Sequence, residues 1–283
     1  MTLKYRREEV TPLKRTSHFH SGSQPCVTAA LAVFAWCWLF MVLGGGGALA
    51  QTSIPVPNAS FESQVAGPPF GVDTRVDSWQ KPDKPDYFDE VAFGFLWDQT
   101  AGMFLDTNPY GNSDGAQVGY VLSFPQAALF QDYDSVDWND STPTHDFDAV
   151  FEPGNSYQLT LGVFGKDMVE GATLELSLYY RDALDNMVTV GSTPVVYSAA
   201  TFPEVPPLNL IDYSVTVSTV QASDEWAGKN IGIKIESTFG SGAGYWDIDN
   251  VRLTAVPEPA SLGLMSVLLG GLLLRRHRVG RAS

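Results

Sequence analysis

Alternating apolar and polar residues fill the middle of this chain. Every second residue between Ser156 and Val163 is apolar, and the same period of two recurs in segments 174–180, 213–217 and 231–235. Neighbouring side chains of a strand point to opposite faces of its sheet, so this period is typical of strands with one buried face. No long stretch of helical periodicity interrupts the middle of the chain, which predicts an all-β fold.

Turn-forming residues separate the predicted strands. They are frequent between Glu62 and Gly115, where strands must be short, and further strands are expected at 117–122 and 127–131. Many short antiparallel strands joined by turns build a sandwich or a barrel. Residues 51–255 are enough for one large domain of this kind, and the prolines between residues 203 and 207 indicate a loop within it.

The last predicted strand has an irregular pattern. Trp246 and Ile248 share one parity, whereas Val251 and Leu253 share the other. One extra residue in a strand, a β-bulge, brings residues of opposite parity to the same face. We therefore expect a bulge near residues 249–250.

Residues 1–50 have the three parts of a secretory signal peptide. A basic start is followed by an apolar segment from Cys26 to Leu43 and by Ala48-Leu49-Ala50, a small-residue cleavage signature. The pair Arg6-Arg7 allows a twin-arginine route, but it lies far before the apolar segment, so the general secretory route is favoured. Both cysteines of the sequence, Cys26 and Cys37, belong to this segment, so the exported domain is expected to have no disulfide.

The domain between the two ends is strongly acidic. Residues 51–255 contain 29 of the 32 Asp and Glu residues and 8 of the 17 Lys and Arg residues, which gives a formal charge of −21. Such an excess argues against nucleic acid and anionic lipid head groups as partners. It agrees with neutral sugars and divalent cations as ligands, and also with simple solubility outside the cell.

Residues 256–283 combine three unlike elements. The first element is the triplet Pro257-Glu258-Pro259, and the second is an apolar run from Ala260 to Leu274. The third is a basic cluster after the run, which contains Arg275, Arg276 and Arg278. As a helix the run would be about 22 Å long, shorter than the hydrocarbon core of about 30 Å. This order resembles the PEP-CTERM sorting signal of Gram-negative bacteria that make extracellular polysaccharide. An ordinary tail anchor is the alternative, but it requires neither the triplet nor so short a run.

The resemblance to PEP-CTERM proteins implies a route through the cell. In that family an exosortase, a membrane-embedded cysteine transpeptidase, recognises the signal and removes or exchanges the tail. The short transmembrane helix would hold the chain in the membrane before processing, with the arginines on the cytoplasmic side. The expected location is the cell surface or the extracellular matrix of a Gram-negative bacterium, after export through the inner membrane.

Three motifs in the middle of the chain resemble the jelly-roll modules of carbohydrate-binding families, which group with galactose-binding-like domains. They are Asn58-Ala-Ser-Phe-Glu62, the segment Phe151 to Leu159, and the segment Trp246 to Leu253. The resemblance covers most of residues 56–254 and implies an antiparallel β-sandwich with jelly-roll topology. The chain departs from the family pattern at Ala59, where a glycine is common, and in the acidic insertion 132–148.

The jelly-roll resemblance also implies a structural calcium ion. In those modules the glutamate of the first motif and an aspartate of the last strand often bind it, which corresponds here to Glu62 and Asp249, with Asp247 as a second candidate. Calcium takes six to eight oxygen ligands, which two carboxylates and backbone carbonyls can supply together. The alternative is that Glu62 pairs with Arg252 or faces water.

Aromatic residues in loops are the candidates for sugar binding, because exposed rings stack on the apolar faces of pyranoses. Trp97, Tyr110 and Trp138 lie in loop-rich sequence, with burial as the alternative for each, whereas Trp79 and Trp246 are expected in the core. The aspartates between residues 132 and 148 lack the spacing of an EF-hand, so a solvated acidic loop is expected there.

The sequence offers little for an enzyme. His145 is the one histidine of residues 51–255, and no Gly-x-Ser-x-Gly motif is present. Two carboxylates would suffice for a glycosidase, so glycoside hydrolysis stays open as a third possibility. The favoured interpretation is an exported protein that binds extracellular polysaccharide without catalysis, and the alternative is a structural protein of the matrix that has no saccharide pocket.

Overall fold

The computed structural model describes residues 51–67, 71–105, 110–137 and 142–258. The predicted signal peptide, the predicted transmembrane helix, Pro259 and the arginine cluster of the tail lie outside these described residues. Within the described part of the chain, no helix is long and apolar enough to cross a membrane.

Strands dominate the described residues, beside one short helix, α2 (Glu90–Phe93), and one 3-10 turn at Trp97–Thr100. The strands are β1 (Thr52–Ile54), β2 (Val72–Asp73), β3 (Ala101–Leu105), β4 (Gln117–Leu122), β5 (Ala128–Gln131), β6 (Asn155–Lys166), β7 (Thr173–Arg181), β8 (Met187–Val196), β9 (Ile211–Val217), β10 (Gly232–Phe239) and β11 (Tyr245–Pro257). The all-β fold expected from the alternating pattern is therefore confirmed.

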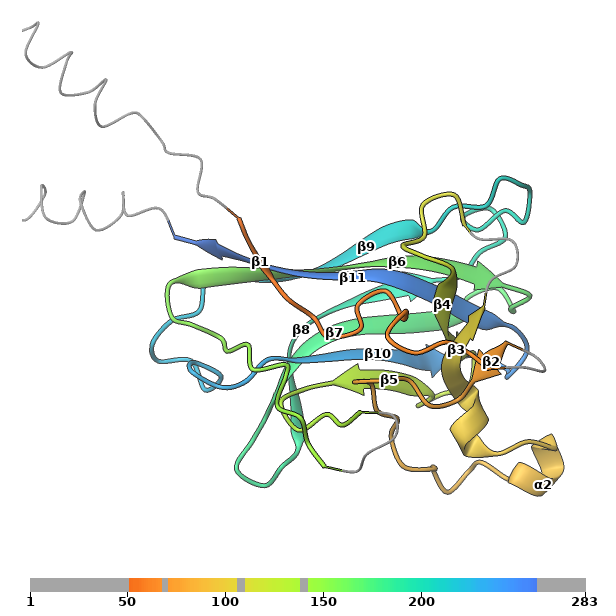
Figure 1. The fold of residues 1–283 in the computed structure, drawn as a ribbon, viewed down its shortest axis with the longest axis horizontal. Coiled ribbons are helices and arrows are strands. Elements are labelled where there is room, and N and C mark those ends of the chain that lie inside the picture. Colours follow the sequence, from red (N-terminus) through yellow and green to blue (C-terminus); the bar gives the residue numbers. More distant parts are fainter. Residues whose placement is uncertain (1–50, 68–70, 106–109, 138–141, 259–283) are drawn as a thin grey trace, which may run out of the picture. The chain divides into compact units, whose positions relative to one another are not determined.

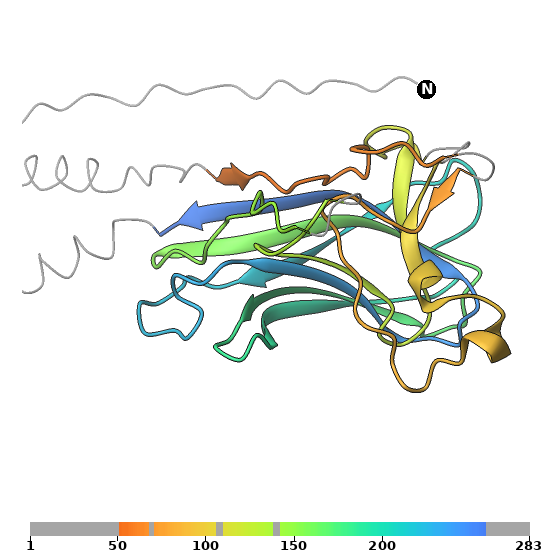
Figure 2. The same cartoon turned by 60° about the horizontal axis from the view of Figure 1, so that its bottom comes forward.

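The strands form two antiparallel sheets that pack as two layers (Figures 1 and 2). The larger sheet has the order β2-β3-β4-β11-β6-β9, and β1 pairs with β11 beside this path. The smaller sheet has the order β5-β10-β7-β8. This arrangement is an antiparallel β-sandwich and agrees with the jelly-roll expectation.

The core lies between the two sheets. Alternate residues of β6, among them Leu159, Leu161 and Val163, are fully buried, as are Leu176 and Ile233 of the facing sheet. Burial of one such side chain stabilises the fold by about 1.5–3 kcal/mol. The period of two seen in the sequence thus exists because one face of each strand meets the other sheet.

The central strand β11 contains the bulge that its irregular pattern predicts. The register with β6 shifts between Asp249 and Arg252, and Asn250 has a positive φ of 58°. As a result both Trp246 and Leu253 are fully buried, although their sequence parities differ. β11 also runs on through Val256 and Pro257, so these two residues of the segment 256–283 belong to the last strand.

A short strand opens the described part of the chain. Residues Thr52–Ile54 form β1, whose partners in β11 are Leu253 to Ala255, and the Gln51 side chain bonds the Thr254 hydroxyl at 2.6 Å. Three residues are too few to show a period of two, so pairing with an available strand edge decides the conformation.

Both ends of the described chain lie at one end of the sandwich (Figure 1). Only short connections join β6 to β7 and β10 to β11, so the last residue of β7 and the first residue of β10 lie at the end where β11 finishes. The amide of Glu258 donates to the carbonyl of Gly154 there, and the amide of Phe151 donates to the carbonyl of Lys229. Helix α2 lies at the opposite end.

Candidate functional site

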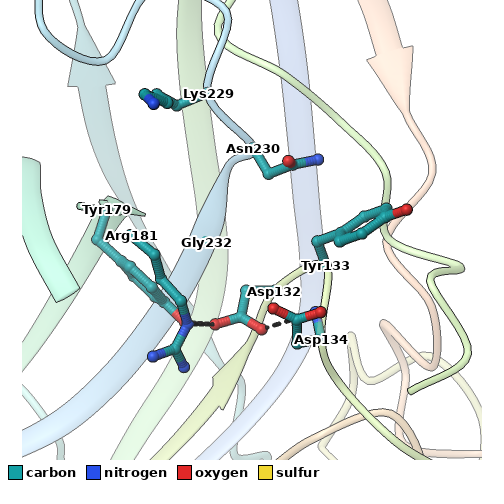
Figure 3. A pocket seen from close by; sticks show the side chains of 8 residues that line it. All are labelled: Asp132, Tyr133, Asp134, Tyr179, Arg181, Lys229, Asn230 and Gly232. Carbon is teal, nitrogen blue, oxygen red and sulfur yellow. Dashed lines mark hydrogen bonds and ion pairs between the residues drawn. The ribbon is translucent and has the colours of Figure 1, made fainter. Parts of the chain in front are cut away.

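A pocket of about 100 Å³ opens where β5, β7 and β10 meet at the end of the smaller sheet. Its lining residues are Asp132, Tyr133, Asp134, Tyr179, Arg181, Lys229, Asn230 and Gly232 (Figure 3). Two of the eight basic residues of the domain line this one pocket. These two cations face two carboxylates, those of Asp132 and Asp134, so positive and negative groups are balanced in this pocket of an acidic domain.

The buried carboxylate of Asp132 organises the floor of the pocket. It accepts hydrogen bonds from the Tyr179 hydroxyl at 2.7 Å, from Arg181 Nε at 2.8 Å and from the amide of Asp134 at 3.1 Å. Burial, reinforced by the charge of Asp132, raises the pKa of Tyr179 well above its ordinary value, so its phenol stays protonated and donates. A buried charge that is paired and bonded in this way holds its partners in one geometry.

A glycine makes room for this network. An added Cβ at Gly232 would lie 2.3 Å from the Tyr179 ring, so the ring packs directly over the bare backbone of β10. Opposite this ring, strand β5 ends at Gln131, and the chain then turns so that Asp132 points toward Arg181 (Figure 3). The pocket thus depends on the pairing of β7 with β10 and of β10 with β5.

The rim of the pocket has one partly exposed aromatic ring. Tyr133 is 37% exposed, and its ring stacks on that of His145 with 4.1 Å between the centroids. His145 Nδ1 also contacts the Tyr133 carbonyl at 2.8 Å and lies 3.8 Å from the Asp134 carboxylate. These contacts hold the Tyr133 ring on the side of the opening opposite Arg181 (Figure 3).

The two cations of the pocket differ in their contacts. Arg181 uses Nε for Asp132 and Nη1 for the Asp185 carbonyl at 3.0 Å. Lys229 is exposed, and its ammonium group forms no ion pair within the residues that the structure describes. Lys229 is therefore the pocket's most available positive charge.

Trp97 does not offer a face to a sugar. It is only 5% exposed, its indole Nε1 donates to the Pro82 carbonyl at 2.9 Å, and its ring packs edge-on against Phe88 at 4.9 Å. Phe88 is also within 5.3 Å of Phe124 in the same aromatic cluster. A large apolar ring in a loop gains most by turning into such a cluster, and burial, the alternative named from the sequence, is what the structure has.

Tyr110 is buried as well. It is 6% exposed, its ring packs against Phe164 at 5.2 Å, and its hydroxyl donates to Asp247. The neighbouring Asn112 fixes this loop, because its amide group bonds both the carbonyl and the amide of Leu210, at 2.9 and 2.8 Å. The third aromatic candidate, Trp138, lies outside the described residues.

The structure brings Glu62 and Asp249 into one neighbourhood. Asp249 is fully buried and accepts the amides of Asp114 and Asn250, each at 2.7 Å. Burial raises the pKa of Asp249 to about 7, and the charges of Asp114 and Glu62 contribute to the rise. Glu62 is exposed and accepts the amide of Ala116 at 2.7 Å.

Asp247 does not join them as a third ligand. It is buried and bonded to the Tyr110 hydroxyl, and no group of three or more His, Cys, Asp or Glu side chains that could hold a metal occurs among the described residues. Two neighbouring carboxylates, those of Glu62 and Asp249, are suitable ligands for a cation. Backbone amides already donate to these carboxylates, so fewer of their lone pairs are left for a metal ion. Arg252, the alternative partner of Glu62, pairs instead with Asp212 at 2.6 Å.

The acidic insertion is only partly the solvated loop that its composition suggests. Asp134, Asp146 and Asp148 are exposed, but Asp132 is 5% exposed and bonded to Tyr179 and Arg181. No local pattern predicts that Asp132 pairs with Arg181, because the two residues are far apart along the chain. The site residues Tyr133, Arg181, Lys229 and Asn230 were missed for the same reason.

A second hollow, of about 260 Å³, lies beside the first segment of the same insertion. Lys81 and Asp98 meet there at 2.9 Å, and burial lowers the pKa of Lys81. Val136 and Asp137 form part of its wall, and the chain that follows them lies outside the described residues. The pocket around Asp132 is therefore the better defined of the two.

No family model and no curated protein matches this chain. Among solved structures it is similar to the Stig cyclase Fisc from Fischerella sp. TAU in complex with a pyrrolidinylidene indole, at 21% identity and a TM-score of 0.49, over 74% of this chain and 100% of the other. It is also similar to TmCBM61 in complex with β-1,4-galactotriose, at 15% identity and a TM-score of 0.36, over 70% of this chain and 95% of the other. A third similar structure, described as CBM4 structure and function, has 10% identity and a TM-score of 0.37, over 72% of this chain and 100% of the other. Likenesses this low assign neither a family nor a function.

Proposed function

We propose that this chain is an exported protein whose β-sandwich binds extracellular polysaccharide without catalysis, at the pocket around Asp132. The observation that carries the proposal is the combination of a partly exposed Tyr133 ring with polar groups that converge on one opening. A sugar has an apolar face and a rim of hydroxyls, so a binding site for it needs one ring for stacking and a few oriented donors and acceptors.

The chemistry of the pocket supplies both parts. Asn230 offers a donor and an acceptor on one side chain, while Arg181 is held rigidly by Asp132 and so needs little ordering when a ligand binds. The stack of Tyr133 on His145 fixes the ring in the same way. A site of this kind would bind and orient a sugar, which is the non-catalytic role proposed here.

Export and processing form the second part of the proposal. The signal peptide of residues 1–50 and the sorting signal of residues 256–283 support passage through the inner membrane and recognition by an exosortase. The cell surface or extracellular matrix of a Gram-negative bacterium is then the place of action. A calcium ion held by Glu62 and Asp249 is also proposed, and the repulsion between their carboxylates supports it.

Affinity electrophoresis through gels that contain single polysaccharides tests the binding. We expect at least one neutral or weakly acidic polysaccharide to retard the protein, and Tyr133→Ala and Asn230→Ala each to weaken the retardation about tenfold while the unfolding midpoint stays unchanged. The matched control is Tyr87→Ala, which removes a tyrosine of similar exposure, 45%, at the opposite end of the sandwich. Retardation that survives both pocket variants would place the site elsewhere.

The alternative, a structural matrix protein with no saccharide pocket, predicts no retardation by any polysaccharide although the protein is folded. The glycosidase alternative predicts release of reducing sugar, which the binding proposal does not. Both measurements use the same purified protein, so the three functions are separated in one set of experiments.

A further inference from the structure

We infer that His145 is a positioning residue for the Tyr133 ring, and that protonation of His145 strengthens glycan binding at the pocket around Asp132. This inference rests on the proposed polysaccharide binding and adds a pH dependence to it. The ring that would stack on a sugar is Tyr133, and its own stacking partner is the one histidine of residues 51–255.

The described segments of the acidic insertion lie against each other near the rim of the pocket. The amide of Thr144 donates to the carbonyl of Ser135 at 3.1 Å. The next residue, His145, has a positive φ of 60°, a conformation that a non-glycine residue keeps where its surroundings hold it. Its imidazole stacks on the Tyr133 ring, with 4.1 Å between the centroids and 18° between the planes. The returning chain thus supports the ring at the rim.

The contacts of His145 are stronger when its ring is charged. Nδ1 lies 2.8 Å from the Tyr133 carbonyl, which can only accept, so Nδ1 carries a proton and donates. Protonation then occurs at Nε2 and makes the whole ring a cation. This cation lies over the face of an aromatic ring and 3.8 Å from the Asp134 carboxylate, and a positive charge strengthens both contacts.

The other charged groups near the pocket leave this effect in place. Arg181 and Lys229 lie apart from the Tyr133 ring in Figure 3, and the carboxylate of Asp146, next to His145 in sequence, is exposed. Histidine is the residue type whose charge changes between about pH 5 and pH 8. A ring that is held more firmly needs less ordering when a sugar stacks on it, so glycan binding should be stronger at the acidic end of this range.

Affinity electrophoresis at pH 5.5 and pH 8 tests this pH dependence, with gels that contain the neutral polysaccharides xylan, galactan or mannan. We expect the polysaccharide that retards the unaltered protein to bind it about threefold more tightly at the lower pH. His145→Phe keeps a ring for the stack but no titrating group, so its retardation should be equal at both pH values. His145→Gln removes the ring and should be retarded less at both. The pKa of Asp249, about 7, lies in the same range, but Asp249 is present in all three proteins, so their difference reports His145.

Nuclear magnetic resonance tests the contact without a glycan. The imidazole signal of His145 is the one that His145→Gln lacks, and the ring signals of Tyr133 are those that Tyr133→Leu lacks. We expect the Tyr133 signals to shift with the same pH midpoint as the His145 signal. Tyr87 is the matched control, since it is 45% exposed at the opposite end of the sandwich and its signals should not follow His145.

A ratio of retardation at the two pH values that is the same in the unaltered protein and in His145→Phe would overturn the inference while polysaccharide binding stands. Tyr133 signals that do not follow the His145 signal would overturn it as well. If Tyr133 follows His145 but no polysaccharide retards the protein at either pH, the proposed function is overturned, and the pH dependence of binding with it.

Discussion

Asp249 shows how folding changes the chemistry of one carboxyl group. Its side chain is fully buried, and burial raises its pKa from 3.8 in the unfolded chain to about 7. The folded state therefore holds this proton more tightly than the unfolded state does. The stabilisation is present at low pH and is lost as the pH rises through about 7.

The unfolding midpoint is accordingly expected to fall between about pH 4 and pH 8. The shift at Asp249 corresponds to a loss on the order of 4 kcal/mol over this range. In Asp249→Asn the unfolding midpoint should fall less between these pH values, because the asparagine amide does not titrate. Thermal unfolding followed by circular dichroism at several pH values measures both proteins.

Asp83→Asn serves as the control, since it removes one exposed carboxylate and should keep the slope of the unaltered protein. Calcium at pH 8 provides a second comparison. A cation at Glu62 and Asp249 would raise the midpoint of the unaltered protein by mass action and leave Asp249→Asn unchanged. If the unfolding midpoint falls with pH equally in the unaltered protein, in Asp249→Asn and in Asp83→Asn, Asp249 is ionised in the folded state.

Single residues also mark the limit of what the sequence predicts about the site. Trp97 and Tyr133 both lie in irregular, turn-rich sequence, yet the first is 5% exposed and the second 37%. The difference comes from partners in other turns of the chain, such as Phe88 and the Pro82 carbonyl for Trp97 and His145 for Tyr133. Nothing in the local pattern identifies these partners, so exposure of a loop ring cannot be inferred from it.

At the scale of elements, the sequence predicts most where burial repeats along a strand. The predicted segment 117–122 is β4 without change, and 127–131 differs from β5 by one residue. The bulge of β11 could be predicted because Trp246 and Leu253 are both large apolar residues that are expected to be buried, although their positions differ in parity. The three-residue β1 was not, because its pairing with β11 depends on an edge that only the folded sheet provides.

The contact between β7 and β10 can be tested with one methyl group. Gly232→Ala would place a Cβ 2.3 Å from the Tyr179 ring, so the ring must move and its bond to Asp132 is lost. We expect a loss of about 1–3 kcal/mol in the free energy of unfolding, typical of overpacking, and weaker polysaccharide retardation. Chemical denaturation and affinity electrophoresis measure the two effects.

Gly67→Ala is the matched control for this change. A Cβ at Gly67 would meet no atom of the described residues within 4 Å, so stability and binding should both stay near those of the unaltered protein. If Gly232→Ala were as stable as the control, Tyr179 would have room to move and the pocket would be less rigid than its contacts indicate.

At the scale of the whole molecule, both ends of the sandwich domain meet the expected processing sites. β1 begins at Thr52, two residues after the expected cleavage at Ala50, and β11 ends at Pro257, within the Pro-Glu-Pro triplet. Mass spectrometry of the protein recovered outside the cell should therefore find an N-terminus near Gln51 and a chain that lacks the arginine cluster. In a strain without exosortase, the tail should remain and the protein should stay in the membrane fraction. Secreted protein with an intact tail would contradict the sorting signal.

The place of β11 in the larger sheet has a mechanical consequence. β11 is hydrogen-bonded to β6 along most of its length, and β4 and β1 flank its other edge. A force applied through the tail pulls this strand along its own axis, so its bonds to the neighbours resist together and do not open one after another from an end. A sandwich held at that end would bear the load through these bonds in shear, with the pocket around Asp132 at the same end of the sandwich.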